Sequence, residues 1–165
     1  MKTAVITGAS GGIGFAIGQK LAALGYQTVL AYNSTLCKDL ENSFAVKCDV
    51  SDFESVENLY NIALEKLGHI DLVVNRAGVA HTDLVQDMSR RQINRVVQTD
   101  LTGTIFSCKF AGGIMARQHF GNIINIASVW GVCGASCEAV YSRAKGGIIA
   151  FTKALAKELA PCKVR

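Results

Sequence analysis

The sequence predicts a doubly wound α/β domain, in which a parallel β-sheet carries helices on both faces. Apolar runs of strand length alternate with helical patterns along the whole chain. These runs are apolar at consecutive positions, which is typical of strands that are buried on both faces. Half of the 165 residues are hydrophobic and only one is proline, so we expect one well-packed domain over residues 1–165, without a linker.

The first half of the chain predicts three strands with helices between them. We expect strands at 3–7, 27–32 and 43–50. We expect helices at 12–25, 35–42 and 52–68, the second of them short and polar. Gly25 and Gly68 stand at the ends of the first and third of these helices, and Asp52 stands at the start of the third.

The second half continues the same alternation. We expect strands at 70–75 and 122–128, and helices at 89–119 and 138–160. The final residues, 162–165, are typical of the beginning of a further strand. Because parallel strands are joined by right-handed crossovers, this alternation predicts the strand order 3-2-1-4-5.

Composition argues against several classes of protein. The net charge is +4, and no Lys/Arg run with interleaved aromatic residues indicates a nucleic-acid partner. No apolar run reaches membrane-spanning length, and the chain enters its first strand directly, without a signal peptide. The six cysteines form no CxxC pair and no zinc-finger spacing with histidine. We therefore expect reduced thiols, a cytoplasmic location, no metal site and no membrane or nucleic-acid partner.

A glycine-rich loop, TGASGGIG at residues 7–14, lies between the first strand and the first helix. Glycines at this place let backbone N–H groups approach a pyrophosphate at the positive end of the helix, although tight-turn glycines are the simpler explanation. The spacing fits both TGxxxGxG and TGxxGxxG, so the loop alone does not distinguish the two motifs. The residues expected to contact a dinucleotide here are Gly8, Ser10, Gly11, Gly12, Ile13 and Gly14.

The second predicted strand ends in Tyr32-Asn33-Ser34. Folds that bind NAD usually have an acidic residue there, which holds the 2′-hydroxyl of the ribose. The missing carboxylate removes a repulsion against a 2′-phosphate, and Asn33 and Ser34 can donate hydrogen bonds to it. The sequence therefore favours NADP over NAD.

Tyr141 and Lys145 lie four residues apart and share one face of a predicted helix. A nearby ammonium lowers the pKa of a phenol from about 10, so that it can exchange a proton with a carbonyl oxygen. A solvated pair on a helix surface is the alternative. Ser128 stands at the C-terminal end of a predicted strand, where open α/β sheets hold their ligands, and its hydroxyl can fix a substrate oxygen.

Five segments in order along the chain resemble the classical short-chain dehydrogenase/reductase family and its Rossmann fold. They are Thr7–Gly14, Cys48-Asp49-Val50, Asn75-Arg76-Ala77-Gly78, Ile126-Ala127-Ser128 and Tyr141–Lys145. Asn75–Gly78 favours the classical type, and the chain is most similar to 3-oxoacyl-[acyl carrier protein] reductase-like members. The run from Ser128 to Glu138 also resembles the elongation factor P 5-aminopentanone reductase branch.

The resemblance implies an oxidoreductase that reduces a carbonyl, in a small molecule or an acyl thioester. It implies that Tyr141 is the general acid/base, that Lys145 binds the nicotinamide ribose and tunes Tyr141, and that Ser128 orients the carbonyl. Asp49 would contact the adenine. The resemblance adds Val50, Asn75, Ala77 and Gly78 to the expected cofactor residues.

The chain differs from the family pattern at three places. Arg76 and Asp100 stand where the family has asparagine, the second of these in its catalytic tetrad. The family chain also continues into a sixth strand, a substrate lid and a seventh strand, so we expect a sheet without the usual last two strands. An inactive dinucleotide-binding module and an inert truncated product are therefore alternatives to an active enzyme. We also expect a homo-oligomer, formed through the predicted strand edge at 122–128 or the helices at 103–119 and 141–159.

Overall fold

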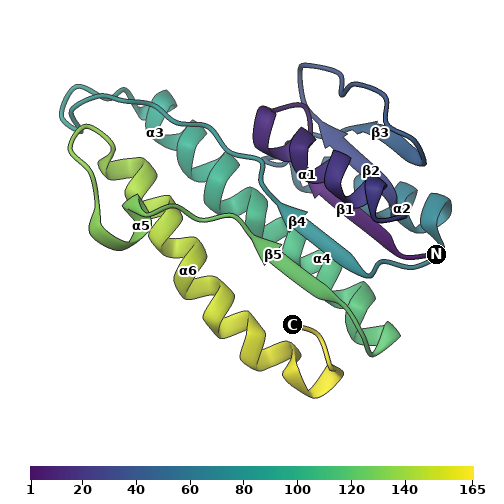
Figure 1. Ribbon diagram of the computed structural model, residues 1–165. Coiled ribbons are helices and arrows are strands. Elements are labelled where there is room, and N and C mark those ends of the chain that lie inside the picture. The colour runs from purple at the N-terminus through teal and green to yellow at the C-terminus, as the bar shows by residue number, and fades with distance from the viewer.

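The computed structural model describes residues 1–165 as a five-stranded parallel sheet with helices on both faces (Figure 1). The strands are β1 (Thr3–Thr7), β2 (Gln27–Tyr32), β3 (Ser43–Lys47), β4 (Leu72–Asn75) and β5 (Asn122–Asn125). The helices are α1 (Gly12–Ala23), α2 (Phe53–Leu67), α3 (Arg90–Val96), α4 (Gly103–Gln118), α5 (Trp130–Cys133) and α6 (Ala139–Leu159). The strand order is β3-β2-β1-β4-β5 and every pairing is parallel, which confirms the predicted topology.

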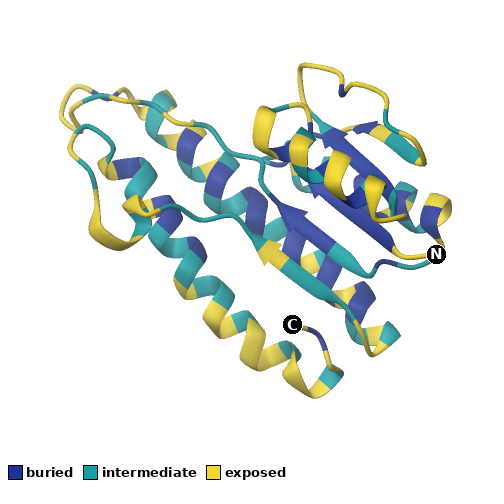
Figure 2. Cartoon of the chain, viewed as in Figure 1, coloured by how far each residue is buried: buried dark blue, intermediate teal, exposed yellow.

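Successive residues of the central strands enter two different hydrophobic cores. Val5 of β1 and Val73 of β4 are paired in register and pack in the core beneath α2 and α4. Ile6 and Val74, the next pair, pack in the core beneath α1. All four residues are buried, at 2% exposure or less. Figure 2 shows that β1 and β4 are buried over most of their length. Burial on both faces is the reason that these strands are apolar at consecutive positions.

The two faces of the sheet are covered unequally. On one face α2 and α4 pack against the sheet and against each other, with the rings of Phe53 and Phe106 5.1 Å apart in an edge-to-face contact. Leu159, the last residue of α6, packs against the same core. On the other face α1 is joined by the loop that connects β2 to β3, which contributes Cys37 and Leu40.

That loop corrects one prediction, because residues 35–42 form no helix. An eight-residue polar segment is too short to be a stable helix by itself, and tertiary contacts take precedence. The Cys37 side chain is buried and its thiol is 3.9 Å from the carbonyl of Leu30. The Ser43 hydroxyl donates to Leu40 O at 2.7 Å and accepts from Leu40 N at 3.2 Å. Asn42 has a left-handed φ of 55°, which turns the chain into β3.

The long helix predicted over 89–119 forms, with an interruption. It begins with a capping box between Ser89 and Gln92, and it ends at His119, which has a left-handed conformation. Between α3 and α4 the chain makes a π-helical stretch, Val97–Thr102 (η1). Such stretches rotate the following helix face and often occur at functional sites. This one contains Asp100, whose side chain is completely buried.

Several predicted boundaries move by a few residues. The strand predicted over 122–128 ends at Asn125. The next residue, Ile126, still donates from its N–H to the carbonyl of Asn75, and beyond it the chain leaves the sheet. It then forms α5, a helix of four residues that the sequence did not predict. The strand predicted over 43–50 ends at Lys47, and the strand predicted over 70–75 starts at Leu72. No helix is both long and apolar enough to cross a membrane.

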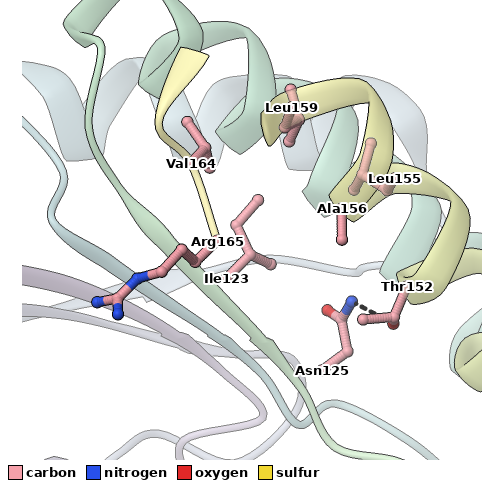
Figure 3. Close-up of a pocket in the computed structure, with 8 residues that line it drawn as sticks. All are labelled: Ile123, Asn125, Thr152, Leu155, Ala156, Leu159, Val164 and Arg165. Atoms are coloured by element: carbon pink, nitrogen blue, oxygen red, sulfur yellow. Dashed lines mark hydrogen bonds between the residues drawn. The ribbon is translucent and has the colours of Figure 1, made fainter. Parts of the chain in front are cut away.

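The last residues begin to pair with the outer edge of β5. After a 3₁₀ turn, Ala160–Cys162 (η2), Val164 forms a parallel bridge with Gly121, and Arg165 O accepts from Ile123 N at 2.7 Å. A small pocket of about 20 Å³ lies between this segment, β5 and α6 (Figure 3). Its lining residues are Ile123, Asn125, Thr152, Leu155, Ala156, Leu159, Val164 and Arg165. The edge of β5 is therefore shorter than the edge predicted at 122–128, although Ile124 remains 42% exposed.

Candidate active site

The glycine-rich loop makes a tight turn that brings it against the segment after β4. Gly8 has a left-handed φ of 65°, and a Cβ at this position would stand 2.8 Å from the Cα of Ala77. A Cβ on Gly14 would collide with the carbonyl oxygen of Gly8. The Thr7 hydroxyl accepts hydrogen bonds from the backbone N–H groups of Arg76 at 3.1 Å and Ala77 at 3.2 Å. The ends of β1 and β4 are thus fixed side by side.

The N-terminus of α1 is open to an anion. Its cap residue, Gly11, supplies no side-chain hydrogen bond, and the first turn contains no acidic residue. A Cβ on Gly12 would meet no atom within 4 Å, so no protein atom crowds this position of the first turn. The first N–H groups of a helix lack partners within the helix, and the helix dipole favours negative charge there. The loop is therefore suited to a pyrophosphate.

A groove of about 230 Å³ runs along the carboxyl ends of the strands, from β2 across the loop to the segment after β4. It is lined by Gly8, Ser10, Gly11, Asn33, Ser34, Cys48, Val50, Arg76, Ala77, Gly78, Val79, Arg95 and Thr99. Eight of the residues predicted to contact a dinucleotide are among them. No lining residue is acidic, and two are arginines, so the groove favours an anionic ligand.

The other predicted cofactor residues lie beside the groove or beneath it. Gly12, Ile13 and Gly14 form the first turn of α1. Asp49 is exposed, and its Oδ1 accepts hydrogen bonds from the hydroxyl of Ser51 at 2.6 Å and from its backbone N–H at 2.9 Å. The Ser51 hydroxyl lowers the pKa of the Asp49 carboxyl, so Asp49 is an anion at neutral pH.

The Asn75 side chain points into the protein, away from the groove. Its Nδ2 donates to Asn125 Oδ1 at 2.9 Å, and its Oδ1 accepts from the Ser107 hydroxyl at 2.5 Å. Ser107 in turn contacts the Tyr60 hydroxyl, and Asn125 donates to Thr152 of α6. This buried network ties β4 and β5 to α2, α4 and α6. Only the backbone of Asn75 is available to a ligand.

Lys145 and Asp100 form a buried ion pair next to Gly78, one of the residues that line the groove. Lys145 Nζ lies 3.3 Å from Asp100 Oδ2, and the two side chains are 5% and 0% exposed. Lys145 also donates to the carbonyl of Ile126 at 3.2 Å, and Asp100 Oδ1 accepts from Val79 N at 2.7 Å. A Cβ on Gly78 would stand 2.8 Å from Asp100 Oδ2 and 3.4 Å from Lys145 Nζ. Gly78 therefore connects the groove with this pair.

Burial raises the pKa of the Asp100 carboxyl, and this effect exceeds the opposing effects of the Val79 N–H, the Lys145 ammonium and the more distant Arg76 guanidinium. Oδ2 makes no hydrogen bond, so the ammonium at 3.3 Å is its main compensation. Removing the cationic partner of such a buried carboxylate strongly destabilises the folded state, because the charge that remains is uncompensated.

Tyr141 and Ser128, the other two residues of the predicted catalytic set, lie on α6 and in the segment after β5. Lys145 Nζ lies 5.5 Å from the centre of the Tyr141 ring, one turn along α6. The Ser128 hydroxyl is half-buried at the end of the segment after β5, where it accepts from Trp130 N at 3.2 Å. A Cβ on Gly131 would stand 2.7 Å from the backbone of Lys145, so α5 lies directly against this part of α6. No group of three His, Cys, Asp or Glu side chains could hold a metal ion.

Two groove residues, Arg95 and Thr99, were not predicted from the sequence; they come from α3 and η1. They lie four residues apart, and this spacing was the only available signal because it puts both on one helix face. Cys48 and Val79 also line the groove, although Cys48 was noted in the sequence only as part of a motif.

Comparison with known proteins agrees with this geometry. A family model described as short chain dehydrogenase matches residues 2–165. The chain belongs to the short-chain dehydrogenase family.

It is 36% identical to the "Uncharacterized oxidoreductase YmfI" of Bacillus subtilis, over 99% of this chain and 71% of that protein. It is 37% identical to a 3-oxoacyl-[acyl-carrier-protein] reductase of Synechocystis, over 96% of this chain and 68% of the relative. A human protein of the same name is 35% identical, over 99% and 72%. As a short-chain dehydrogenase, the chain is an oxidoreductase by family, and the family implies a nicotinamide dinucleotide as cofactor.

Proposed function

We propose that this short-chain dehydrogenase is an NADP-dependent reductase of a carbonyl substrate, with Tyr141 as the proton donor. The observation that carries the proposal is the position of Lys145. Its ammonium is held between Asp100 and the carbonyl of Ile126, beside the Tyr141 ring and next to Gly78, which lines a groove without acidic residues.

The choice of NADP rests on the end of β2. Asn33 and Ser34 line the groove there, and neither carries the negative charge that would repel a 2′-phosphate. Gly8, Ser10, Gly11 and the first turn of α1 would hold the pyrophosphate through backbone N–H groups. Val50, Ala77 and Gly78 would form the wall against the adenosine, with Asp49 beside it. The cofactor, when bound, supplies a hydride.

Each polar side chain of the predicted catalytic set has a distinct part in the proposed reaction. The Ser128 hydroxyl holds the carbonyl oxygen of the substrate, and the Tyr141 hydroxyl donates a proton to that oxygen. The Lys145 ammonium lies beside the Tyr141 ring, and it would donate to the hydroxyls of the nicotinamide ribose when the cofactor is bound. Asp100 keeps Lys145 in place through the buried ion pair.

The substrate class comes from the relatives. Two of them are named for the reduction of 3-oxoacyl groups on acyl carrier protein, so we propose an acyl thioester or a related small carbonyl compound. A cytoplasmic location is supported by the six cysteines, none of which forms a disulfide.

The test is the oxidation of NADPH in the presence of an acetoacetyl thioester, followed by absorbance, for the wild type and for Tyr141→Phe. We expect turnover by the wild type, a loss of about a hundredfold or more in Tyr141→Phe, and unchanged NADPH binding. The matched control is Tyr26→Phe, which changes a tyrosine remote from the groove. Binding of NADPH without turnover of any carbonyl compound would instead support the alternative of a dinucleotide-binding module.

A further inference from the structure

Arg76 occupies a place that exists only because residue 11 is glycine. A Cβ built on Gly11 would stand 2.7 Å from Nη1 of Arg76 and 3.1 Å from its Cζ. The backbone of Gly11 does not itself require glycine, because its φ of −81° and ψ of 157° suit any residue. The missing side chain at Gly11 therefore makes room for the guanidinium, which lies over the glycine-rich loop.

The guanidinium of Arg76 is available to a ligand. It forms no ion pair and no hydrogen bond with any other group of the chain, although a guanidinium has five donors. Its backbone is fixed by the Thr7 hydroxyl, so the side chain starts from a rigid position. Arg76 lines the same groove as Asn33 and Ser34, and no carboxylate lines that groove.

We propose that Arg76 binds the 2′-phosphate on the adenosine ribose of NADP(H) and so determines the choice of cofactor. This inference rests on the proposed function, because it needs a dinucleotide in the groove. Arg76 lines the same groove as Asn33 and Ser34 at the end of β2, where that phosphate is expected, whereas Gly12–Gly14 at the start of α1 do not line it. The N–H groups of α1 serve the pyrophosphate, and the guanidinium can bind a second phosphate in a bidentate manner.

The experiment compares the affinities for NADPH and NADH in the wild type, Arg76→Gln and the control Arg91→Gln, by isothermal titration calorimetry. Arg91 is an exposed arginine on α3 that does not line the groove. We expect Arg76→Gln to weaken NADPH binding by about 10-fold to 100-fold, the range for a hydrogen bond between charged groups, and to leave NADH binding unchanged. The control should match the wild type with both cofactors. The NADPH to NADH ratio is measured within one sample, so partial unfolding of a variant does not change it.

Gly11→Ala provides a second, independent variant. The added methyl group should displace the guanidinium, so this variant should lose the same preference for NADPH. In the Arg76→Gln background the additional Gly11→Ala change should have a much smaller effect, because the guanidinium is already absent. A titration with 2′,5′-ADP and with 5′-ADP should reproduce the pattern without the nicotinamide.

The outcomes separate this inference from the proposed function. If the wild type binds neither cofactor, the proposed function fails, and Arg76 has no cofactor to select. If the wild type binds NADPH and Arg76→Gln keeps the wild-type ratio, the inference is wrong while the proposed function stands. An equal loss of NADPH and NADH binding would also overturn it, because the guanidinium would then act on the pyrophosphate or on the shape of the loop.

Discussion

Removal of the Lys145 ammonium tests the buried ion pair on which the site is built. At 3.3 Å, and with an effective dielectric constant of about 20, the attraction between Lys145 and Asp100 is about 5 kcal/mol before desolvation is counted. Lys145→Met leaves the fully buried Asp100 carboxylate without its ion-pair partner, and only the more distant guanidinium of Arg76 still favours its charged form. We therefore expect this variant to lose about 3–5 kcal/mol of unfolding free energy at neutral pH.

The cost should depend on the charge of residue 100. Asp100→Asn keeps an oxygen for the Val79 N–H but removes the carboxylate, so Lys145→Met in this background should cost at least about 2 kcal/mol less. The free energies are measured by urea unfolding, followed by far-UV circular dichroism. Lys153→Met, an exposed lysine on the same helix, is the control and should change stability by no more than about 0.5 kcal/mol.

The pH dependence has a definite sign. Burial raises the pKa of Asp100 in the folded state, so the folded state binds this proton more tightly than the unfolded state does. The pKa of Asp100 in the unfolded state is about 3.9. Below this value the protonated carboxyl makes its full contribution to the free energy of unfolding, and this contribution is lost as the pH rises through the pKa of Asp100 in the folded state. Without Lys145 the folded pKa rises further, so the deficit of Lys145→Met should be largest at neutral pH and smaller at about pH 5. Equal costs of Lys145→Met in the wild-type and Asp100→Asn backgrounds, at both pH values, would refute the reasoning.

Three further predictions concern the groove, the packing of α5 and the edge of the sheet. Asn33→Asp should shift the preference from NADPH toward NADH by about tenfold, because the new carboxylate repels the 2′-phosphate; comparative titration measures this, and an unchanged preference would contradict it. Gly131→Ala should lower the unfolding free energy by about 1–3 kcal/mol, since its Cβ would meet the backbone of Lys145 at 2.7 Å; urea unfolding measures this, with Gly113→Ala on α4 as the control because its Cβ would meet nothing closer than 3.8 Å. Ile124→Lys on the exposed edge of β5 should reduce self-association in light scattering, and an unchanged mass would point to α4 and α6 as the interface instead.

The order of strands and helices could be read from the sequence because it depends on local patterns. Strands such as β1 and β4 are buried on both faces, and this leaves an apolar signature that no neighbouring element changes. The pairing of Tyr141 with Lys145 follows from the geometry of one helix, and the tight turn at Gly8 follows from the loop composition. These features needed only short-range information.

Tertiary structure decided what the local pattern left open. Residues 35–42 have helical composition, but the burial of Cys37 against the core beneath α1 holds them as a loop. The π-helical stretch that buries Asp100 beside Lys145 joins residues 45 positions apart, and no local signal fixes such a register. Whether the Asn75 side chain faces the groove depends on partners in α4 and β5, and the place of Arg76 depends on the absence of a side chain at Gly11. Each of these outcomes is set by close packing between segments that are distant in sequence, where a single side chain decides which groups reach the groove.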